Sequence, residues 1–437
     1  MSVAKSKFAA TLRVSSGNFL EMYDFQVYAY FATYIAKAFF PSSNEFVSLM
    51  ATLATFGAGY LMRPLGALVL GAYVDRHGRR KGLILSLGLM SVGTAVIALT
   101  PAYAAIGVAA PLIVVAGRLL QGFSAGVELG GVSVYLSEIA PPGRRGFYCS
   151  WQSASQQVAV ILAASLGVVL VRTLAPPDMQ TWGWRTPFLV GCLIVPFLLV
   201  LRRSLEETEA FRAQTHPPSV GELAGSMLKN WRVVLIGMMM VIMTTTTFYL
   251  ITAYTPTFVQ KVLKLTAEQS LLVTLCVGVS NFIWLPIGGT VSDRIGRRPL
   301  LFFCTLATLV SAYPLMVWLV GAPSMPRLLT VELWLSAMFG IYNGAMIPFL
   351  TEIIPFRIRT IGFSFAFSVA TAVFGGFTPA ICTYLIHVTG NQAMPGVWVS
   401  LAAGCGLIAA FATAGKATNA HRASAHPDLQ PQSGAPA

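Results

Sequence analysis

Long hydrophobic runs recur along the whole 437-residue chain. Each run is close to the ~20 residues that a helix needs to cross the hydrocarbon core of a membrane. Backbone groups in that core must be hydrogen-bonded within their own segment, so runs of this length are expected to be helical. Only 10% of the residues are charged and 55% are hydrophobic, whereas soluble proteins carry ~25% charged residues. The sequence therefore predicts an all-α membrane protein.

The hydrophobic runs fall into two sets of six. The first set spans 16 to 38, 47 to 73, 82 to 102, 107 to 137, 147 to 174 and 184 to 203. The second set spans 233 to 260, 268 to 291, 300 to 320, 327 to 353, 361 to 388 and 394 to 415. We expect two six-helix halves, 1–203 and 233–415, with a cytoplasmic central loop at 204–232 and a disordered tail at 416–437. The loop contains a His216-Pro217-Pro218 turn signal.

Basic residues lie mainly on one side of this arrangement. With a cytoplasmic N-terminus, the inner loops and termini hold 21 of the 29 Lys and Arg residues, and the outer loops hold six. Positively charged loops stay on the cytoplasmic side, so we expect both termini in the cytoplasm and the chain in a bacterial inner membrane. The net charge of +13 is spread over short loops, which disfavours a nucleic-acid-binding face.

Two motifs occur twice at nearly the same offset. Gly-x-x-x-Asp-Arg-x-Gly-Arg-Arg begins at Gly71 and again at Gly289, 218 residues later. Glu-Ile-x-Pro, followed by an arginine seven residues after the glutamate, begins at Glu138 and again at Glu352, 214 residues later. Motifs duplicated at equivalent helix ends indicate that the two halves share a structural template.

The Gly-x-x-x-Asp-Arg-x-Gly-Arg-Arg loop makes the chain similar to the major facilitator superfamily, and the likeness covers essentially the whole chain. Three other stretches resemble its metabolite:proton symporter family, and within that family the chain is most similar to citrate and tricarballylate:proton symporters. These stretches are Gly17-Asn18-Phe19-Leu20-Glu21-Met22-Tyr23-Asp24-Phe25, Arg63-Pro64-Leu65-Gly66, and Arg118-Leu119-Leu120-Gln121-Gly122 running on to Glu128. The resemblance implies the major facilitator fold and secondary active transport, with substrate bound between two halves that rock around it.

Acidic residues in the inner loops need their own explanation, because these loops select for basic residues. Asp75 and Asp293 could accept hydrogen bonds from a helix N-terminus or pair with an arginine of a neighbouring helix. Such contacts would latch the inner side closed; the alternative is that the loop charges only fix topology. The residues expected in the latch are Asp75, Arg79, Asp293, Arg297, Glu138, Arg145, Glu352 and Arg359.

Ionisable residues within the spans are candidates for proton coupling, because a charge at mid-membrane costs at least ~2.5–3.5 kcal/mol. Glu21 and Asp24 lie on one face of the first helix. On the fourth helix, Arg118, Gln121 and Glu128 lie within an arc of about 80°. The expected proton carriers are Asp24, Glu21 and Glu128, and Glu128 has an equal alternative as a structural partner of another helix.

Asp24 and Arg118 are the favoured coupling pair, because the proton affinity of a carboxylate depends on a nearby guanidinium. The resemblance agrees, since sugar porters of the superfamily pair an acid of helix one with an arginine of helix four. A proton on Asp24 would release Arg118 to hold a substrate carboxylate. The alternative is a static ion pair that joins two helices.

The predicted substrate-binding set also includes residues outside this pair. Arg63 lies about 18 Å along the second helix from Asp75, and it is expected either to bind an anion or to pack beside the Pro64 kink. Polar side chains of other helices are expected to complete the site. The full set is Arg118, Arg63, Gln121, Gln152, Gln156, Thr247, Tyr254, Tyr342 and Asn343.

The favoured function is proton-coupled import of a small organic acid, with citrate or a related tricarboxylate as the preferred substrate. Dicarboxylates, shikimate and zwitterionic osmolytes are the alternatives. An enzyme is disfavoured because the sequence lacks a nucleophile elbow, a phosphate-cradling loop and metal-type cysteine spacing. We expect no cofactor and no metal. The expected partners are the organic anion, protons and the lipid bilayer, and the transporter is expected to act as a monomer.

The split in basic residues generates a test of topology. In a variant without the six native cysteines, a cysteine at position 43 should react with an impermeant thiol reagent added outside intact cells. A cysteine at position 424 should react only after the cells are opened, because the C-terminus is expected inside. Reaction of both positions from one side would contradict the twelve-helix arrangement.

Overall fold

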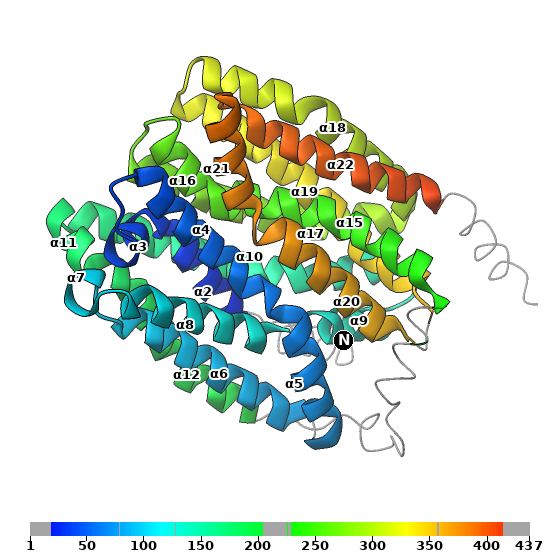
Figure 1. Cartoon of the computed structure of the whole chain (residues 1–437). Coiled ribbons are helices and arrows are strands. Elements are labelled where there is room, and N and C mark those ends of the chain that lie inside the picture. The colour runs from blue at the N-terminus through cyan, green and yellow to red at the C-terminus, as the bar shows by residue number, and fades with distance from the viewer. Residues whose placement is uncertain are drawn as a thin grey trace, which may run out of the picture.

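The computed structural model describes residues 19–77, 79–126, 128–203, 225, 229–355 and 358–413. Within these residues the chain is helical apart from short connections, and it contains no strand. The long helices run roughly in one direction, and the two halves of the chain lie side by side (Figure 1). The predicted all-α architecture is confirmed.

The first half contains six helical spans, three of them built from one continuous helix. These three are α6 (Arg79–Leu99), α10 (Arg145–Thr173) and α12 (Thr186–Arg203). The interrupted spans are α2 (Phe19–Tyr30) with α3 (Ala32–Phe39), α4 (Glu45–Leu61) with α5 (Arg63–His77), and α8 (Ala109–Ala125) with α9 (Glu128–Ile139). The short α7 (Tyr103–Ile106), α11 (Pro176–Thr181) and η2 (Gly183–Arg185) lie in connections.

The second half also contains six spans, and two of them include a π-helical turn. The continuous helices are α17 (Ala267–Ile295), α18 (Arg297–Gly321), α19 (Met325–Ile353) and α22 (Met394–Ala412). The π turn η3 (Leu250–Tyr254) separates α15 (Trp231–Tyr249) from α16 (Thr255–Lys261), and η5 (Thr371–Gly375) separates α20 (Arg359–Ala370) from α21 (Thr378–Thr389). Such wide turns are frequent at functional sites.

The twelve spans agree with the predicted ones to within a few residues. By length and composition, eight helices of the described chain could cross a membrane, and the shorter apolar helices Ile84–Leu99 and Ala109–Ala125 lie in two of the remaining spans. Most of the predicted central loop, and all of the predicted tail, lie outside the described residues. The assignment of those segments therefore stays a prediction.

Local capping chemistry sets several helix ends. The Asn44 side chain accepts a hydrogen bond from the Phe46 amide at the start of α4. Thr266 and Gln269 form a reciprocal capping box at the start of α17. Gly296 ends α17 with a φ of +92°, a conformation that favours glycine, so the chain turns directly into α18.

The two halves touch along α10 and α17, which lie together through much of their length. They approach each other closely at Gly146 and Gly289. A Cβ atom on Gly289 would lie 2.4 Å from the Gly146 carbonyl oxygen, so any larger residue there would force the two helices apart. Small residues at such crossings allow helices to pack closely in membranes.

The halves also contact each other at both ends of the bundle. At one end, called the Glu45 end, Lys261 of α16 pairs with Glu45 of α4, and the rings of Phe46 and His387 stack with centroids 3.8 Å apart. At the opposite end, called the Asp293 end, the hydroxyls of Ser137 and Thr351 lie 3.2 Å apart. The structure thus has the two halves in contact at both ends.

Candidate functional site

Two arginine side chains lie inside the first half of the bundle. Arg63 is 2% exposed and begins α5, directly after the interruption at Met62, whereas Arg118 is 0% exposed and lies within α8. A buried guanidinium is costly unless other groups compensate its charge. The neighbours of each arginine therefore decide what it can do.

Arg63 is neutralised by an acid of the first span. Its Nη2 atom donates to Glu21 Oε1, and both side chains are buried. The guanidinium also lies over the rings of Tyr60 and Phe25, with its Cζ atom 4.5 Å and 5.1 Å from their centroids. Of the two readings left open for Arg63, an anion site and a packing residue, this ion pair favours a structural role.

Arg118 is surrounded by aromatic rings instead of carboxylates. Its Cζ atom lies 4.2 Å, 4.6 Å and 5.3 Å from the ring centroids of Phe25, Tyr28 and Phe56. Its Nη1 atom donates to Gln121 Oε1 at 2.8 Å, but Nε and Nη2 have no hydrogen-bond partner among the described residues. Guanidinium donors of this kind fit a carboxylate with two parallel bonds.

Asp24 and Arg118 are linked through two intermediate side chains. Thr94 donates to Asp24 Oδ2, Gln121 Nε2 donates to Thr94 Oγ1 at 3.0 Å, and Arg118 donates to Gln121. The predicted coupling pair of Asp24 and Arg118 is therefore connected indirectly in this structure, without a direct ion pair between the two side chains. The observed ion pair of the first span instead joins Glu21 to Arg63.

Sequence reasoning missed Thr94, which is the central link of this chain of hydrogen bonds. It is 1% exposed on α6, and α6 packs against α8, so Thr94 meets both Asp24 and Gln121. A single threonine in an apolar span carries no signal of its own, because threonine hydroxyls commonly bond to their own helix. Only the packing of α6 reveals this position.

Polar side chains of the two halves meet near the middle of the bundle. Asn343 Nδ2 of α19 donates to Ser153 Oγ of α10 at 2.9 Å, and Ser153 donates to Gln152 Oε1 at 2.8 Å. Thr244 of α15 donates to Asn343 Oδ1 at 3.0 Å. The predicted residues Gln152 and Asn343 therefore belong to one network that crosses the interface between the halves.

The other predicted polar residues are buried in different settings. Gln156 and Thr247 are both buried, and within the described chain the Thr247 hydroxyl has no hydrogen-bond partner. The Tyr254 hydroxyl accepts from Thr383 at 3.3 Å. The Tyr342 hydroxyl donates to the Met240 carbonyl at 3.0 Å, so its hydrogen already serves to hold α19 against α15.

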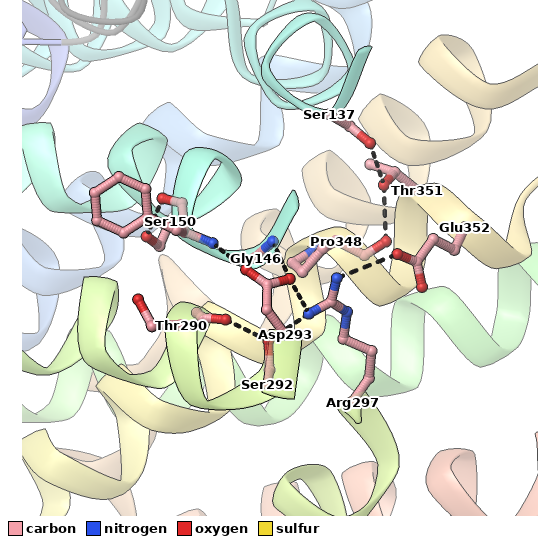
Figure 2. A network of polar contacts seen from close by, with 12 residues as sticks. Ser137, Gly146, Ser150, Thr290, Ser292, Asp293, Arg297, Pro348, Thr351 and Glu352 are labelled. Carbon is pink, nitrogen blue, oxygen red and sulfur yellow. Dashed lines mark hydrogen bonds and ion pairs between the residues drawn. The ribbon is translucent and has the colours of Figure 1, made fainter. Parts of the chain in front are cut away.

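Figure 2 shows the predicted latch of the second half at the Asp293 end. Asp293 of α17 accepts from the backbone amides of Gly146 at 2.8 Å and Phe147 at 3.0 Å, which lie in the first turn of α10. Arg297 donates to Asp293 Oδ1 at 2.6 Å and to Glu352 Oε1 at 3.4 Å. A carboxylate of one half thus satisfies the helix N-terminus of the other.

The remaining predicted latch residues are placed less tightly. Arg145 begins α10 and is exposed, Glu138 is exposed near the end of α9, and Arg359 begins α20 and is half-buried. The side chains of three predicted residues lie outside the described part of the chain. They are Asp75, Arg79 and Glu128.

Glu332 of α19 is a buried acid that the sequence reasoning passed over. It is 6% exposed, and its Oε1 atom accepts a hydrogen bond from Thr255 at 2.8 Å. The available signal was an acidic residue within the predicted span 327 to 353, the same signal that singled out Asp24.

Two family models match the chain. The model described as "Major Facilitator Superfamily" matches residues 14–309, and the model described as "Sugar (and other) transporter" matches residues 212–417. The crystal structure of a D-xylose-proton symporter superposes with a TM-score of 0.75 at 20% identity, covering 93% of this chain and 97% of that one. At this identity the likeness concerns the fold.

Two relatives are much more similar in sequence. The chain is 59% identical over 402 residues to the citrate-proton symporter of Salmonella typhi. The aligned residues make up 92% of this chain and 93% of the relative. It is 60% identical over 404 residues to the citrate-proton symporter of Klebsiella pneumoniae. Here the aligned residues make up 92% of this chain and 91% of the relative.

The buried pair of Glu21 and Arg63 generates a prediction about stability. Removing either charge alone leaves the other buried without compensation, so Glu21→Gln and Arg63→Gln should each lower the free energy of unfolding by about 3–5 kcal/mol. The double variant should lose less than the sum, which melting curves in detergent would measure. As a control, Glu268→Gln removes the partner of the exposed Arg172 and should cost about 0–1 kcal/mol. Strictly additive losses would contradict the pairing.

Proposed function

The chain belongs to the major facilitator superfamily, and from this premise we propose that it is a symporter that imports citrate, or a related tricarboxylate, together with protons. The observation that carries the proposal is the buried guanidinium of Arg118, which keeps two nitrogen atoms without a partner in the described chain and is joined by hydrogen bonds to Asp24. The relatives at 59% and 60% identity support the choice of citrate.

Arg118 is suited to hold a substrate carboxylate. Its direct contacts in the described chain are aromatic faces and the neutral side chain of Gln121, so an incoming anion would supply the direct ionic partner that this buried cation lacks. Arg63 lies in the same aromatic cluster, but its charge is already balanced by Glu21. When Asp24 is protonated, one net positive charge therefore remains to attract an anion.

Asp24 is suited to carry a proton. It is fully buried, no described residue forms an ion pair with it, and Thr94 stabilises its ionised form by donating a hydrogen bond. A substrate carboxylate at Arg118 would add negative charge close to Asp24, and nearby negative charge favours the protonated acid. Binding of the anion and binding of the proton would then reinforce each other, which is the coupling that symport requires.

The contacts at the two ends of the bundle suggest how access could alternate. We assign the Asp293 end to the cytoplasm and the Glu45 end to the outside of a bacterial inner membrane, with both chain termini cytoplasmic, because the basic loops gather at the Asp293 end. Transport would break one set of contacts while the other holds. The network of Gln152, Ser153 and Asn343 lies between the two sets, where substrate would reach both halves.

Uptake into proteoliposomes tests this proposal. Vesicles containing the purified protein should accumulate labelled citrate when an inward proton gradient is imposed, and the citrate recovered from inside should be chemically unchanged. The panel should also contain a dicarboxylate, shikimate and a betaine, which are the competing substrates. Accumulation that is independent of the proton gradient, or a preference for another member of the panel, would contradict the proposal.

The role of Asp24 generates a prediction about coupling. Asp24→Asn imitates the protonated acid permanently, so it should abolish accumulation of citrate against a gradient while counterflow exchange continues. Asp178→Asn, in the exposed connecting helix α11, serves as the control and should leave both activities unchanged. Undiminished concentration of citrate by Asp24→Asn would move the proton to another carboxylate.

The contacts of Asp293 generate a prediction about the rate of transport. An asparagine can accept with only one of its two terminal atoms, so Asp293→Asn should lose one bond to the α10 amides and the ion pair with Arg297. We expect slower uptake with citrate binding retained, because the damage falls on the change of conformation. Glu352→Gln, which removes a longer and more exposed contact, should slow uptake less. Wild-type rates in Asp293→Asn would refute a latch.

A further inference from the structure

Glu332 has the surroundings of a proton-binding residue, although the mechanism above does not use it. Its Oε2 atom has no hydrogen-bond partner in the described chain, and no basic side chain there pairs with it. Leu328, Val331 and Leu335 of the same helix are buried in the apolar cluster that also contains Leu250. An ionised carboxylate without a cation is costly in such a place, so the protonated acid is favoured.

The charged and titratable groups on the elements that pack around this end of α19 are engaged elsewhere. Arg327 donates to the Trp318 carbonyl, Tyr254 accepts from Thr383, and Tyr313 accepts from Asn391. Glu268 pairs with Arg172, and Lys261 pairs with Glu45. The only hydrogen-bond partner that the described chain provides for Glu332 is therefore a neutral hydroxyl, that of Thr255.

The Thr255 hydroxyl has one hydrogen and two acceptors within reach. Its Oγ1 atom lies 2.8 Å from Glu332 Oε1 and 3.1 Å from the Leu250 carbonyl oxygen. When Glu332 is ionised, Thr255 donates to the carboxylate. When a proton adds to Oε1, the carboxyl group donates to Thr255, and the Thr255 hydrogen turns to Leu250. Protonation therefore changes which bond Thr255 makes.

Leu250 is the first residue of the π turn η3, so the change in the hydrogen bond of Thr255 acts on this turn. The Leu250 carbonyl accepts the backbone amide of Thr255, which closes the wide turn. A second hydrogen bond from the Thr255 hydroxyl would reinforce the same carbonyl, and ionised Glu332 would withdraw it. Because π turns are less stable than the α-helix around them, one added bond can shift their geometry.

The π turn also touches the substrate site of the first half. Gln26 of α2 donates to Thr252 within η3 at 3.3 Å. Tyr249, the residue before η3, packs its ring 5.2 Å from Tyr60 and 6.2 Å from Phe56, measured between centroids. Tyr60 and Phe56 are the rings that lie beside Arg63 and Arg118. A change in η3 is thus transmitted by direct contact to the proposed anion site.

We propose that Glu332 is a second proton-binding site, located in the second half, which acts through Thr255 and the π turn η3 on the substrate site of the first half. The inference rests on proton-coupled citrate transport as the function. It adds a residue to that mechanism and predicts that at least two protons enter with each citrate, one on Asp24 and one on Glu332.

The first test measures the coupling ratio in proteoliposomes with citrate as the probe and the membrane potential held at zero. Net flux of citrate stops at a certain ratio of its inside concentration to its outside concentration. Each coupled proton changes this ratio about tenfold per unit of pH difference across the membrane. Glu332→Gln should lower this dependence by one proton relative to the wild type, and protonation of citrate itself cancels in the comparison. An equal ratio in the variant and the wild type would overturn the proposal. Failure of the wild type to move citrate would instead reject the proposed function.

The second test requires no substrate, so it remains decisive if Glu332→Gln does not transport. Infrared spectra of the purified protein at neutral pH should contain the carbonyl band of a protonated carboxylic acid that is lost in Glu332→Gln and kept in the control Glu268→Gln. Thr255→Val should shift the band because the carboxyl group loses its partner, whereas Thr255→Ser should leave it in place. If Glu332→Gln does not fold, the two Thr255 variants decide the question. A spectrum that neither Glu332→Gln nor Thr255→Val changes would refute a protonated Glu332.

Discussion

The compensation of buried positive charge is the constraint on which the rest of this site depends. Arg63 and Arg118 share one aromatic cluster, and two uncompensated guanidinium groups could not lie together in a membrane interior. Glu21 neutralises Arg63, whereas the guanidinium of Arg118 contacts aromatic rings and the side-chain amide of Gln121. In the proposed mechanism, Arg118 therefore requires an anion, and the hydrogen-bonded path to Asp24 connects that requirement to a proton.

The contacts between the halves at the two ends of the bundle are polar. The contacts at the Asp293 end use one carboxylate on two backbone amides, and those at the Glu45 end include an ion pair between the half-buried Lys261 and the exposed Glu45. Both are polar contacts that water can replace when an end opens. Gly146 and Gly289 pack closely at the Asp293 end itself, where the Gly146 amide also donates to Asp293.

Most of the fold followed from the sequence because the membrane imposes a simple rule on helix length and polarity. The twelve spans, and the carboxylate of Asp293 at a helix N-terminus, agree with expectations drawn from hydrophobic runs and a duplicated motif. The partners of the buried charges could not be predicted from the sequence. Glu21 and Asp24 share one helix face, and only the packing of the helices decides which of them contacts an arginine. The place of Thr94 in the site could not be predicted for the same reason, whereas Glu332 could have been identified from its charge alone.

Citrate binding to the purified protein, measured by titration calorimetry, tests most directly whether Arg118, and not Arg63, holds the substrate anion. Arg118→Gln should weaken binding roughly tenfold or more, since it removes a charge-assisted contact worth about 1.5–3 kcal/mol. The double variant Glu21→Gln/Arg63→Gln, which removes a balanced pair, should bind within a few-fold of the wild type. Equal binding by Arg118→Gln and the wild type, or a larger loss in the double variant, would contradict the account.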